Sequence, residues 1–323
     1  MQSLKLNGFI LTAHREDAGG SHRLRYHGVS DNGPFEIIIS NSKPLFFVEK
    51  DSDTSCLSMA TQRKSVALKS FAGREVDALY FNEQNKLYEA KDVLADKGIR
   101  TYESDVRPEA RYLMERFING SVLIEGQGTL KNGIIEFVNP KLGKSNYRPT
   151  LSTLSVDIET SMGNDLYSIG LHFVKGDKEF KHVFMVGDTN ERVHDEMTIL
   201  PGEREVLVAF LQETQLLDPD LIIGWHVIGF DLMFLERKFK QYNLDFCLGR
   251  KKTSIRLTER KGAGFFANIE GRVVVDGPPT LRSAFYSFEN FKLETVAREL
   301  LGVGKDIGEA GSDKVEEITR RFN

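Results

Sequence analysis

The pattern of apolar and polar positions changes near the middle of this 323-residue chain. Over roughly the first 145 residues, alternating apolar runs are mixed with helix-like segments, which predicts a mixed α+β domain. Hairpin turns are expected at Asp31-Asn32-Gly33 and Lys131-Asn132-Gly133, because Asn-Gly supplies the positive φ angles of a tight turn. Two helices are expected, over 82–100 and 107–118.

A polar stretch with two prolines at 139–152 marks the expected domain boundary, giving domains 1–147 and 148–323. After it, three strand-like segments are followed by alternating strand-like and helix-like segments. This order predicts an α/β domain with a mixed sheet. The expected strands are 153–160, 166–174, 180–188, 218–225 and 271–277, and the expected helices are 202–217, 230–242 and 292–302.

Composition and charge indicate an ordinary soluble protein. The formal charge is −4, with 40% hydrophobic and 28% charged residues. No run approaches the ~18 apolar residues of a membrane span, so no membrane partner is expected. We also expect no signal peptide. Cys56 and Cys247 lie far apart and favour isolated thiols over a disulfide or zinc site. These features predict a cytoplasmic protein.

Two carboxylates lie inside the strand-like segment 153–161. Asp157 and Glu159 are two residues apart, so in a strand they point to the same face. The simplest interpretation of such a pair is an acidic face that meets solvent. The flanking residues are strongly apolar, however, which favours a buried strand and makes an unpaired acidic pair costly.

A third carboxylate, Asp231, follows the strand-like segment 218–225 at the start of a predicted helix. It is either a first-turn acid favoured by the helix dipole or a ligand-binding group at a strand end. With Asp157 and Glu159 it could hold one or two Mg²⁺ or Mn²⁺ ions for phosphodiester hydrolysis. The sequence has no zinc-type His/Cys spacing, no phosphate-binding GxxxxGK[ST] loop and no nucleophile elbow.

The segment 236–262 is basic, with nine Lys or Arg against three Asp or Glu. It is either a solvated helix end and loop or a surface that binds a nucleic-acid backbone. Aromatic residues are interleaved with the charges; one or two could stack on unpaired bases, and more of them are expected in the core. They are Phe239, Tyr242, Phe246, Phe265 and Phe266.

These residues carry a resemblance to a known family. "SVDIET" resembles the first exonuclease motif of family B DNA polymerases, and "GWHVIGFD" resembles the second, Asn-x-x-x-Phe-Asp. Three further segments, "DVRPEARYLMERFI", "DPDLIIGW" and "SFENFKLETVARELLG", are similar to the bacterial DNA polymerase II group. The ordered match covers essentially the whole chain. It implies a polymerase N-terminal domain over 1–147 and a ribonuclease H-like 3′–5′ exonuclease domain over 148–323.

The resemblance also implies roles for individual residues. Asp157 and Glu159 become metal ligands, with Glu159 near the attacking water, and Asp231 becomes a ligand of the second metal or an acid beside it. Phe230 helps to pack the second motif. His226 stands where the family has the Asn that helps to position the substrate's end, so we expect reduced activity or a changed pH profile.

After the second motif the sequence has no Tyr-x-x-x-Asp that would match the family's third exonuclease motif, and the family's polymerase motifs do not occur. Asp276 lies at a strand end, and we expect it near the site without replacing the missing acid. We therefore expect an amino-terminal fragment of a longer protein, made for expression, with weak or no nuclease activity. Loss of one negative ligand would leave the metals loosely bound.

Three functional hypotheses follow. The first is a fragment of a DNA polymerase whose parent extends primer-template DNA in replication and repair and proofreads single-stranded 3′ ends. A sliding clamp is a candidate partner of that parent, which would associate with the nucleoid when on DNA. The second is a free-standing DEDD-type nuclease with its last acid elsewhere. The third is a non-catalytic module that binds single-stranded DNA or a partner protein.

Overall fold

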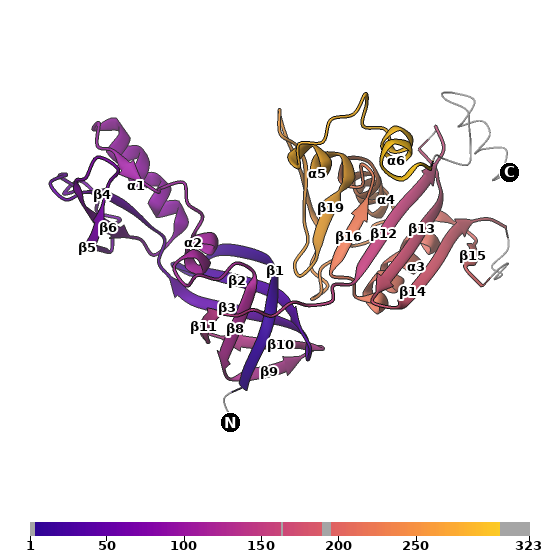
Figure 1. Ribbon diagram of the computed structural model, residues 1–323, viewed down its shortest axis with the longest axis horizontal. Helices are drawn as coiled ribbons and strands as arrows, with labels where there is room; N and C mark the ends of the chain where they lie inside the picture. The colour runs from indigo at the N-terminus through magenta and orange to yellow at the C-terminus, as the bar shows by residue number, and fades with distance from the viewer. Residues whose placement is uncertain (1–3, 163, 189–194, 304–323) are drawn as a thin grey trace. The chain divides into compact units, whose positions relative to one another are not determined.

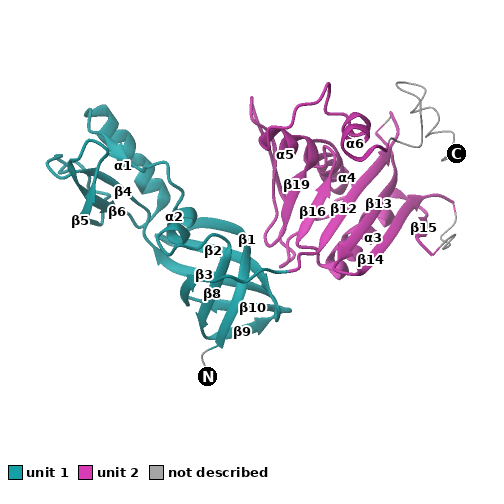
Figure 2. Ribbon diagram, viewed as in Figure 1, with its two compact units in different colours: residues 1–149 teal, residues 150–323 magenta. Residues whose placement is uncertain are grey.

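The computed structural model describes residues 4–162, 164–188 and 195–303 of the chain (Figure 1). The chain forms two compact units, Met1–Pro149 and Thr150–Asn323 (Figure 2). The division lies two residues beyond the boundary predicted at 147/148. No helix among the described residues is long and apolar enough to cross a membrane.

The first unit contains a seven-stranded sheet in the order β11-β8-β1-β2-β3-β10-β9. Neighbouring strands are antiparallel except β3 and β10, which run parallel. Tyr26, Phe35 and Phe137 are buried at the centre of its core. The strands are β1 (Leu4–Ala18), β2 (Ser21–Ser30), β3 (Gly33–Ser42), β8 (Ser121–Gly126), β9 (Gly128–Lys131), β10 (Ile134–Val138) and β11 (Lys141–Lys144).

Both predicted hairpins are present, but their turns differ. Between β9 and β10, Asn132 and Gly133 both have positive φ angles of 50° and 79°, as the Asn-Gly pair predicts. Between β2 and β3, Gly33 has a φ of 103° while Asn32 does not have a positive φ. The expectation that both residues of the pair adopt positive φ is therefore wrong for the first turn.

A smaller antiparallel sheet in the same unit has the order β5-β6-β4-β7. Helix α1 covers one face, where Leu87 and Leu94 bury against Phe46. Both helices predicted for this part of the chain are present, and Pro108 is the first residue of α2. The elements are β4 (Leu45–Glu49), β5 (Gln62–Lys69), β6 (Glu75–Tyr80), α1 (Gln84–Asp96), β7 (Thr101–Tyr102) and α2 (Pro108–Met114).

The second unit is built on a six-stranded mixed sheet in the order β15-β14-β13-β12-β16-β19. β12 pairs antiparallel with β13 and parallel with β16, which in turn pairs parallel with β19. A separate hairpin joins β17 and β18. The strands are β12 (Thr153–Thr160), β13 (Leu166–Lys175), β14 (Lys178–Val186), β15 (Met197–Leu200), β16 (Leu221–Gly224), β17 (Arg256–Arg260), β18 (Gly264–Asn268) and β19 (Val273–Asp276).

Helices of the second unit cover one face of this sheet. Leu154, Val156 and Ile158 of β12 are buried in one core with Val206 and Phe210 of α3, as the apolar periodicity predicts. Figure 1 shows α3 behind β13 and β14. The helices are α3 (Glu203–Leu217), the π-helical turn η1 (Ile228–Leu232), α4 (Met233–Gln241), α5 (Gly277–Ser283) and α6 (Leu293–Leu301).

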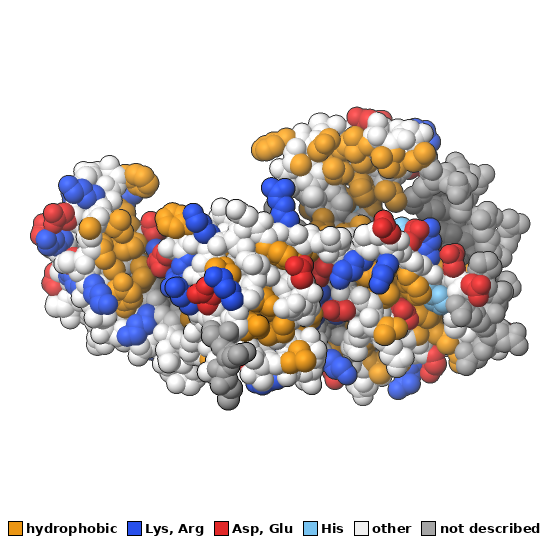
Figure 3. All heavy atoms as spheres, turned by 60° about the horizontal axis from the view of Figure 1, so that its bottom comes forward, with side chains coloured by type: hydrophobic (Ala, Val, Ile, Leu, Met, Phe, Trp, Pro, Cys, Tyr) orange, Lys and Arg blue, Asp and Glu red, His pale blue; other side chains and the backbone are white. Residues whose placement is uncertain are grey.

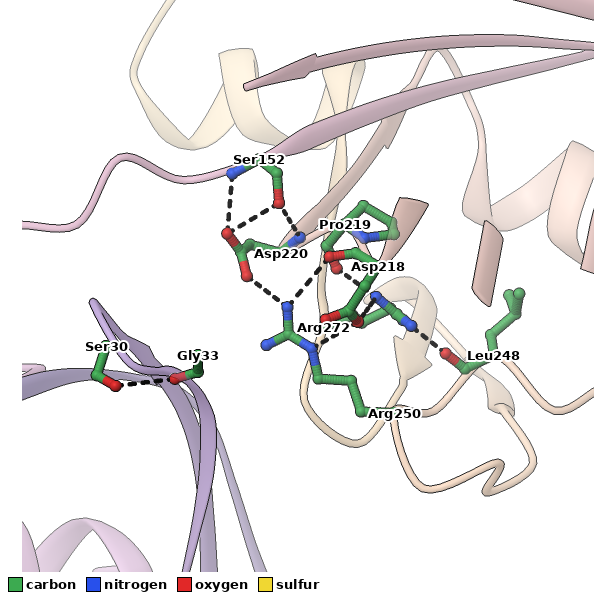
Figure 4. Close-up of polar contacts among 9 residues, drawn as sticks. All are labelled: Ser30, Gly33, Ser152, Asp218, Pro219, Asp220, Leu248, Arg250 and Arg272. Atoms are coloured by element: carbon green, nitrogen blue, oxygen red, sulfur yellow. Dashed lines mark hydrogen bonds and ion pairs between the residues drawn. The ribbon is translucent and has the colours of Figure 1, made fainter. Parts of the chain in front are cut away.

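A buried network of charges joins the beginnings of β12, β16 and β19 (Figure 4). The backbone N–H and hydroxyl of Ser152 both donate to Asp220 Oδ2, at 2.8 and 2.9 Å. Arg250 pairs with Asp218 and Asp220, and Arg272 donates to Asp218 at 2.8 Å. Burial lowers the pKa of Arg272 to about 10. These cations have structural partners within the fold.

A second buried network fixes α4 against α3. The carboxylate of Glu203 accepts hydrogen bonds from Lys238 Nζ at 2.8 and 2.9 Å and from the Tyr242 hydroxyl at 2.9 Å. It also accepts the Leu166 N–H at 2.6 Å. The Lys238 side chain is only 3% exposed, so Glu203 is its counterion in a site with little solvent.

Replacing Glu203 is therefore expected to destabilise the second unit. Glu203→Gln leaves the Lys238 ammonium without a counter-charge, and we expect the free energy of unfolding to fall by ~1–3 kcal/mol in urea denaturation. Glu205→Gln is the matched control in the same helical turn, since the Glu205 side chain is 42% exposed and lies 3.7 Å from Arg204. It should change stability by less than ~0.5 kcal/mol. Equal losses from both variants would contradict the assignment.

Candidate functional site

The centre of the second unit's sheet carries two predicted site residues, Asp157 and Glu159. They alternate with the buried residues of β12, so they lie on its other face, where Asp157 is exposed and Glu159 half-buried. The pairing register of β12 shifts directly after Glu159. Such a β-bulge re-aims side chains and is common beside active sites.

Asp231 approaches the same strand from η1. Its side chain is 2% exposed, and its Oδ1 accepts the N–H of Ile158 at 3.2 Å. Ile158 lies between Asp157 and Glu159, so this bond fixes Asp231 beside the acidic pair. The sequence suggested that Asp231 lies at the start of an ordinary α-helix. It lies instead in a π-helical turn, a distortion frequent at functional sites.

The environment of Asp231 favours its neutral form. Burial, followed by the negative charges of Asp157 and then Asp276, raises the pKa of Asp231 to about 7. The N–H of Ile158 acts in the opposite direction. Asp231 and Asp157 are therefore close enough to repel each other, and a proton or a cation would relieve that repulsion.

The turn from β16 to η1 is anchored on two sides. The indole Nε1 of Trp225 donates to the carbonyl of Phe291, at 3.1 Å. On the other side, a Cβ added at Gly229 would lie 2.7 Å from Cδ2 of Phe265 on β18. Residue 229 is therefore a glycine because the aromatic ring occupies the space of a side chain.

His226 and Phe230 are both exposed at this turn. His226 has a φ of 60°, a left-handed conformation that costs most residues ~1–2 kcal/mol but in which Asn, Asp and His are enriched. A change from Asn to His at this position therefore keeps the backbone conformation accessible. The Phe230 ring is 50% exposed and lies 6.3 Å from the Phe234 ring, so one of its faces remains open.

Sequence reasoning placed Asp276 near the site but missed what its side chain does. Asp276 Oδ1 accepts the N–H of His226 at 2.8 Å, and Oδ2 accepts the N–H of Ile228 at 3.2 Å. The sequence signal was an aspartate at the end of a strand. That signal does not reveal the direction of the carboxylate, which depends on the pairing of β16 with β19.

The carboxylates have the chemistry that a hard divalent cation requires. The structure brings Asp157 and Asp231 into electrostatic contact, and Glu159 shares the face of Asp157. Within residues 4–162, 164–188 and 195–303, however, no three His, Cys, Asp or Glu side chains form a group that could hold a metal. The donor types therefore fit such an ion, and the described residues supply part of a coordination shell.

An open groove of about 370 Å³ runs over the face of β12, β13 and β14 beside Asp157. Its polar lining includes Asp157, His172, Lys181 and Glu196. Figure 3 shows this unit hollowed below the largely hydrophobic lobe that carries α5 and α6, with charged and His side chains on the opposite wall. The groove gives solvent and small solutes access to Asp157.

The basic segment 236–262 divides into structural and exposed charges. Lys238 and Arg250 are buried in the two networks, whereas Arg256, Arg260 and Lys261 are exposed. The interleaved aromatic residues divide in the same way. Phe239, Tyr242 and Phe246 belong to the core, and Phe265 and Phe266 are 40% and 41% exposed on β18.

Comparisons with known proteins agree with this arrangement. Residues 99–296 match the model of the DNA polymerase family B, exonuclease domain. DNA polymerase II of Escherichia coli is 36% identical over 98% of this chain, and a DNA polymerase of Archaeoglobus fulgidus is 26% identical over 84%. The chain spans 40% and 35% of the lengths of these relatives.

Solved structures show the same fold. The family B DNA polymerase of the archaeon Pyrobaculum calidifontis aligns with 93% of this chain and 40% of its own, with a TM-score of 0.72 and 17% identity. The expectation of a ribonuclease H-like α/β exonuclease domain after a mixed α+β domain is confirmed.

The raised pKa of Asp231 predicts a pH-dependent stability. Folded Asp231 titrates at about 7 and the unfolded residue near 3.8, so the folded state holds the proton more tightly between these values. The contribution of Asp231 to stability should therefore fall as pH rises from ~4 to ~7. Asp231→Asn removes this titration, and its stability relative to wild type should rise by ~1–4 kcal/mol between pH 4 and pH 8.

Urea denaturation at both pH values checks this prediction. Asp177→Asn serves as the control, because Asp177 lies exposed in the turn between β13 and β14. A difference between Asp231→Asn and wild type that does not change with pH would show that Asp231 is not held in its neutral form.

Proposed function

The chain belongs to the family of DNA polymerase family B exonuclease domains, and from this we propose that Thr150–Asn323 removes nucleotides from the 3′ ends of single-stranded DNA. The observation that carries the proposal is the bond from the Ile158 N–H to Asp231. It holds a buried carboxylate between the positions of Asp157 and Glu159 on the strand. Asp231 in electrostatic contact with Asp157, with Glu159 on the same strand face, favours metal-assisted phosphodiester hydrolysis.

The ion in this proposal is Mg²⁺ or Mn²⁺, held by Asp157, Glu159 and Asp231. A divalent ion supplies positive charge to the phosphodiester and to the attacking water. Asp231 must release its proton to become a ligand, and its pKa of about 7 makes that release strongly pH-dependent in the neutral range. Glu159 lies on the exposed side of β12, from which it can orient a water molecule.

Substrate contacts in the proposal come from the η1 turn and the β17–β18 hairpin. His226 and the open face of Phe230 are available to the terminal nucleotide. Arg260 lies 5.0 Å from the centre of the Phe266 ring, which pairs a cation with an exposed aromatic face. Such pairs suit unpaired bases and their phosphates.

The relatives extend the proposal to a longer protein. In that protein the chain would form the N-terminal and proofreading parts of a DNA-directed DNA polymerase that acts on primer-template DNA in replication and repair. A cytoplasmic location, association with the nucleoid and a sliding-clamp partner belong to the same proposal and rest on the resemblance alone.

A second candidate function is binding of single-stranded DNA without turnover. The observation that favours it is the incomplete ligand group among the described residues. Exposed Arg256, Arg260 and Lys261 would supply salt-dependent contacts to phosphates in either case. Binding that weakens with salt but produces no mononucleotides would support this alternative.

Digestion of a 3′-labelled single strand distinguishes the two functions. We expect slow release of mononucleotides that requires Mg²⁺ or Mn²⁺, and a loss of ~100-fold or more in Asp157→Asn because the ion then lacks a charged ligand. Asp188→Asn, an exposed aspartate outside the site, is the control and should cleave like wild type. Equal turnover in Asp157→Asn and wild type would overturn the assignment of Asp157.

The histidine at position 226 predicts a difference in pH dependence. His226→Asn keeps a side chain compatible with the left-handed φ of 60° but cannot change charge between pH 5 and 8. We expect the variant to cleave ~2–10-fold faster near pH 6 and to lose one inflection of the pH–rate profile. Superimposable profiles of the two proteins would remove His226 from the substrate contacts.

A further inference from the structure

Asp276 occupies the N-cap position of α5 but does not cap that helix. Aspartate at this position normally accepts the N–H of the second or third residue of its own helix, but here these residues are Pro278 and Pro279, which have no N–H. Its carboxylate turns toward the loop that leaves β16, where it accepts the N–H groups of His226 and Ile228. The helix offers Asp276 no capping bond, and its side chain holds a neighbouring segment.

Those two bonds hold a segment whose backbone departs from regular helix and strand geometry. His226 has a left-handed φ of 60°, and residues 228–232 form the π-helical turn that carries Asp231. The carbonyl of His226 accepts the N–H of Phe230 at 2.9 Å, so this turn starts from His226 itself. A strained backbone of this kind persists only when its surroundings hold it in place.

The two oxygens of Asp276 are suited to that task. The side chain is 7% exposed, and each oxygen takes one backbone N–H. β19 pairs with β16 so that Asp276 lies opposite Gly224, two residues before His226. The carboxylate is therefore fixed to the sheet while it holds the first residues of the turn.

We infer that Asp276 is a positioning residue that holds the His226–Asp231 turn against the sheet and thereby sets the place of Asp231 in the site. This inference rests on the proposed nuclease function only for its effect on catalysis. Its structural part concerns the backbone of residues 226–232. The role assigned to Asp276 is to hold the turn, because each of its two oxygens accepts one backbone N–H of that turn.

Hydrogen–deuterium exchange of the whole 323-residue chain tests the structural part directly. In Asp276→Ala the amides of residues 226–232 should exchange ~10-fold or more faster than in wild type. Asp276→Asn retains one carbonyl oxygen and should show an intermediate rate, which keeps the test valid if the alanine variant does not fold. Wild-type exchange at His226 and Ile228 in both variants would overturn the inference.

The chain offers a matched control in its other unit. Asp17 also holds two backbone N–H groups with its two oxygens, those of Gln84 at 2.9 Å and Asn85 at 3.1 Å, at the start of α1. Asp17→Ala should accelerate exchange at the start of α1 and leave residues 226–232 unchanged. Faster exchange of 226–232 in the control would mean that general destabilisation, not loss of Asp276, opens the turn.

Kinetics of 3′-end digestion test the catalytic part. A displaced Asp231 should lower kcat by ~10-fold or more in Asp276→Ala while KM for the DNA strand stays within ~2-fold, with partial recovery in Asp276→Asn. Unchanged kcat together with faster exchange would refute positioning of Asp231. A wild-type chain without nuclease activity would refute the proposed function, while the exchange result would still decide the role of Asp276.

Discussion

Burial of Asp231 beside Asp157 is the constraint on which the architecture of the site depends. A carboxylate that is 2% exposed and close to another negative charge is unfavourable unless hydrogen bonds, a proton or a cation compensate it. The Ile158 N–H supplies part of that compensation, and it is available only if η1 lies directly against β12. η1 is also closely packed on β18, where the Phe265 ring occupies the space that a side chain at position 229 would need.

The buried arginine and lysine side chains of the second unit are compensated by carboxylates. Arg250 pairs with Asp218 and Asp220, Arg272 pairs with Asp218, and Lys238 contacts both oxygens of Glu203. In each case a cation and an anion meet at hydrogen-bond distance, so the buried charges stabilise each other. Asp231 instead accepts a backbone N–H, and burial beside Asp157 raises its pKa to about 7. Ion pairs stabilise the fold, whereas a carboxylate with a strongly raised pKa is a candidate for a functional site.

Local sequence patterns correctly predicted those parts of the structure that depend on local geometry. The period of two in β12 correctly predicted that Asp157 and Glu159 share a face, and apolar spacing predicted α3 and α4. The patterns did not predict contacts between segments that lie far apart in the sequence. The basic segment 236–262 was interpreted as either a solvated helix end and loop or a nucleic-acid surface, yet Lys238 and Arg250 pair with buried residues that lie 30 or more positions away.

The backbone contacts of Asp231 and Asp276 could not be predicted for the same reason. The bond from Ile158 to Asp231 spans 73 residues, and those from His226 and Ile228 to Asp276 span 50 and 48. Each depends on the order β12-β16-β19, in which strands distant in sequence become neighbours. An aspartate at the end of a strand looks the same in the sequence whether it binds a metal, caps its helix or holds a neighbouring turn. Only the direction of its two oxygens separates these roles, and at Asp276 both oxygens face backbone N–H groups. The carboxylate therefore contributes to the site through the shape of the turn that carries Asp231.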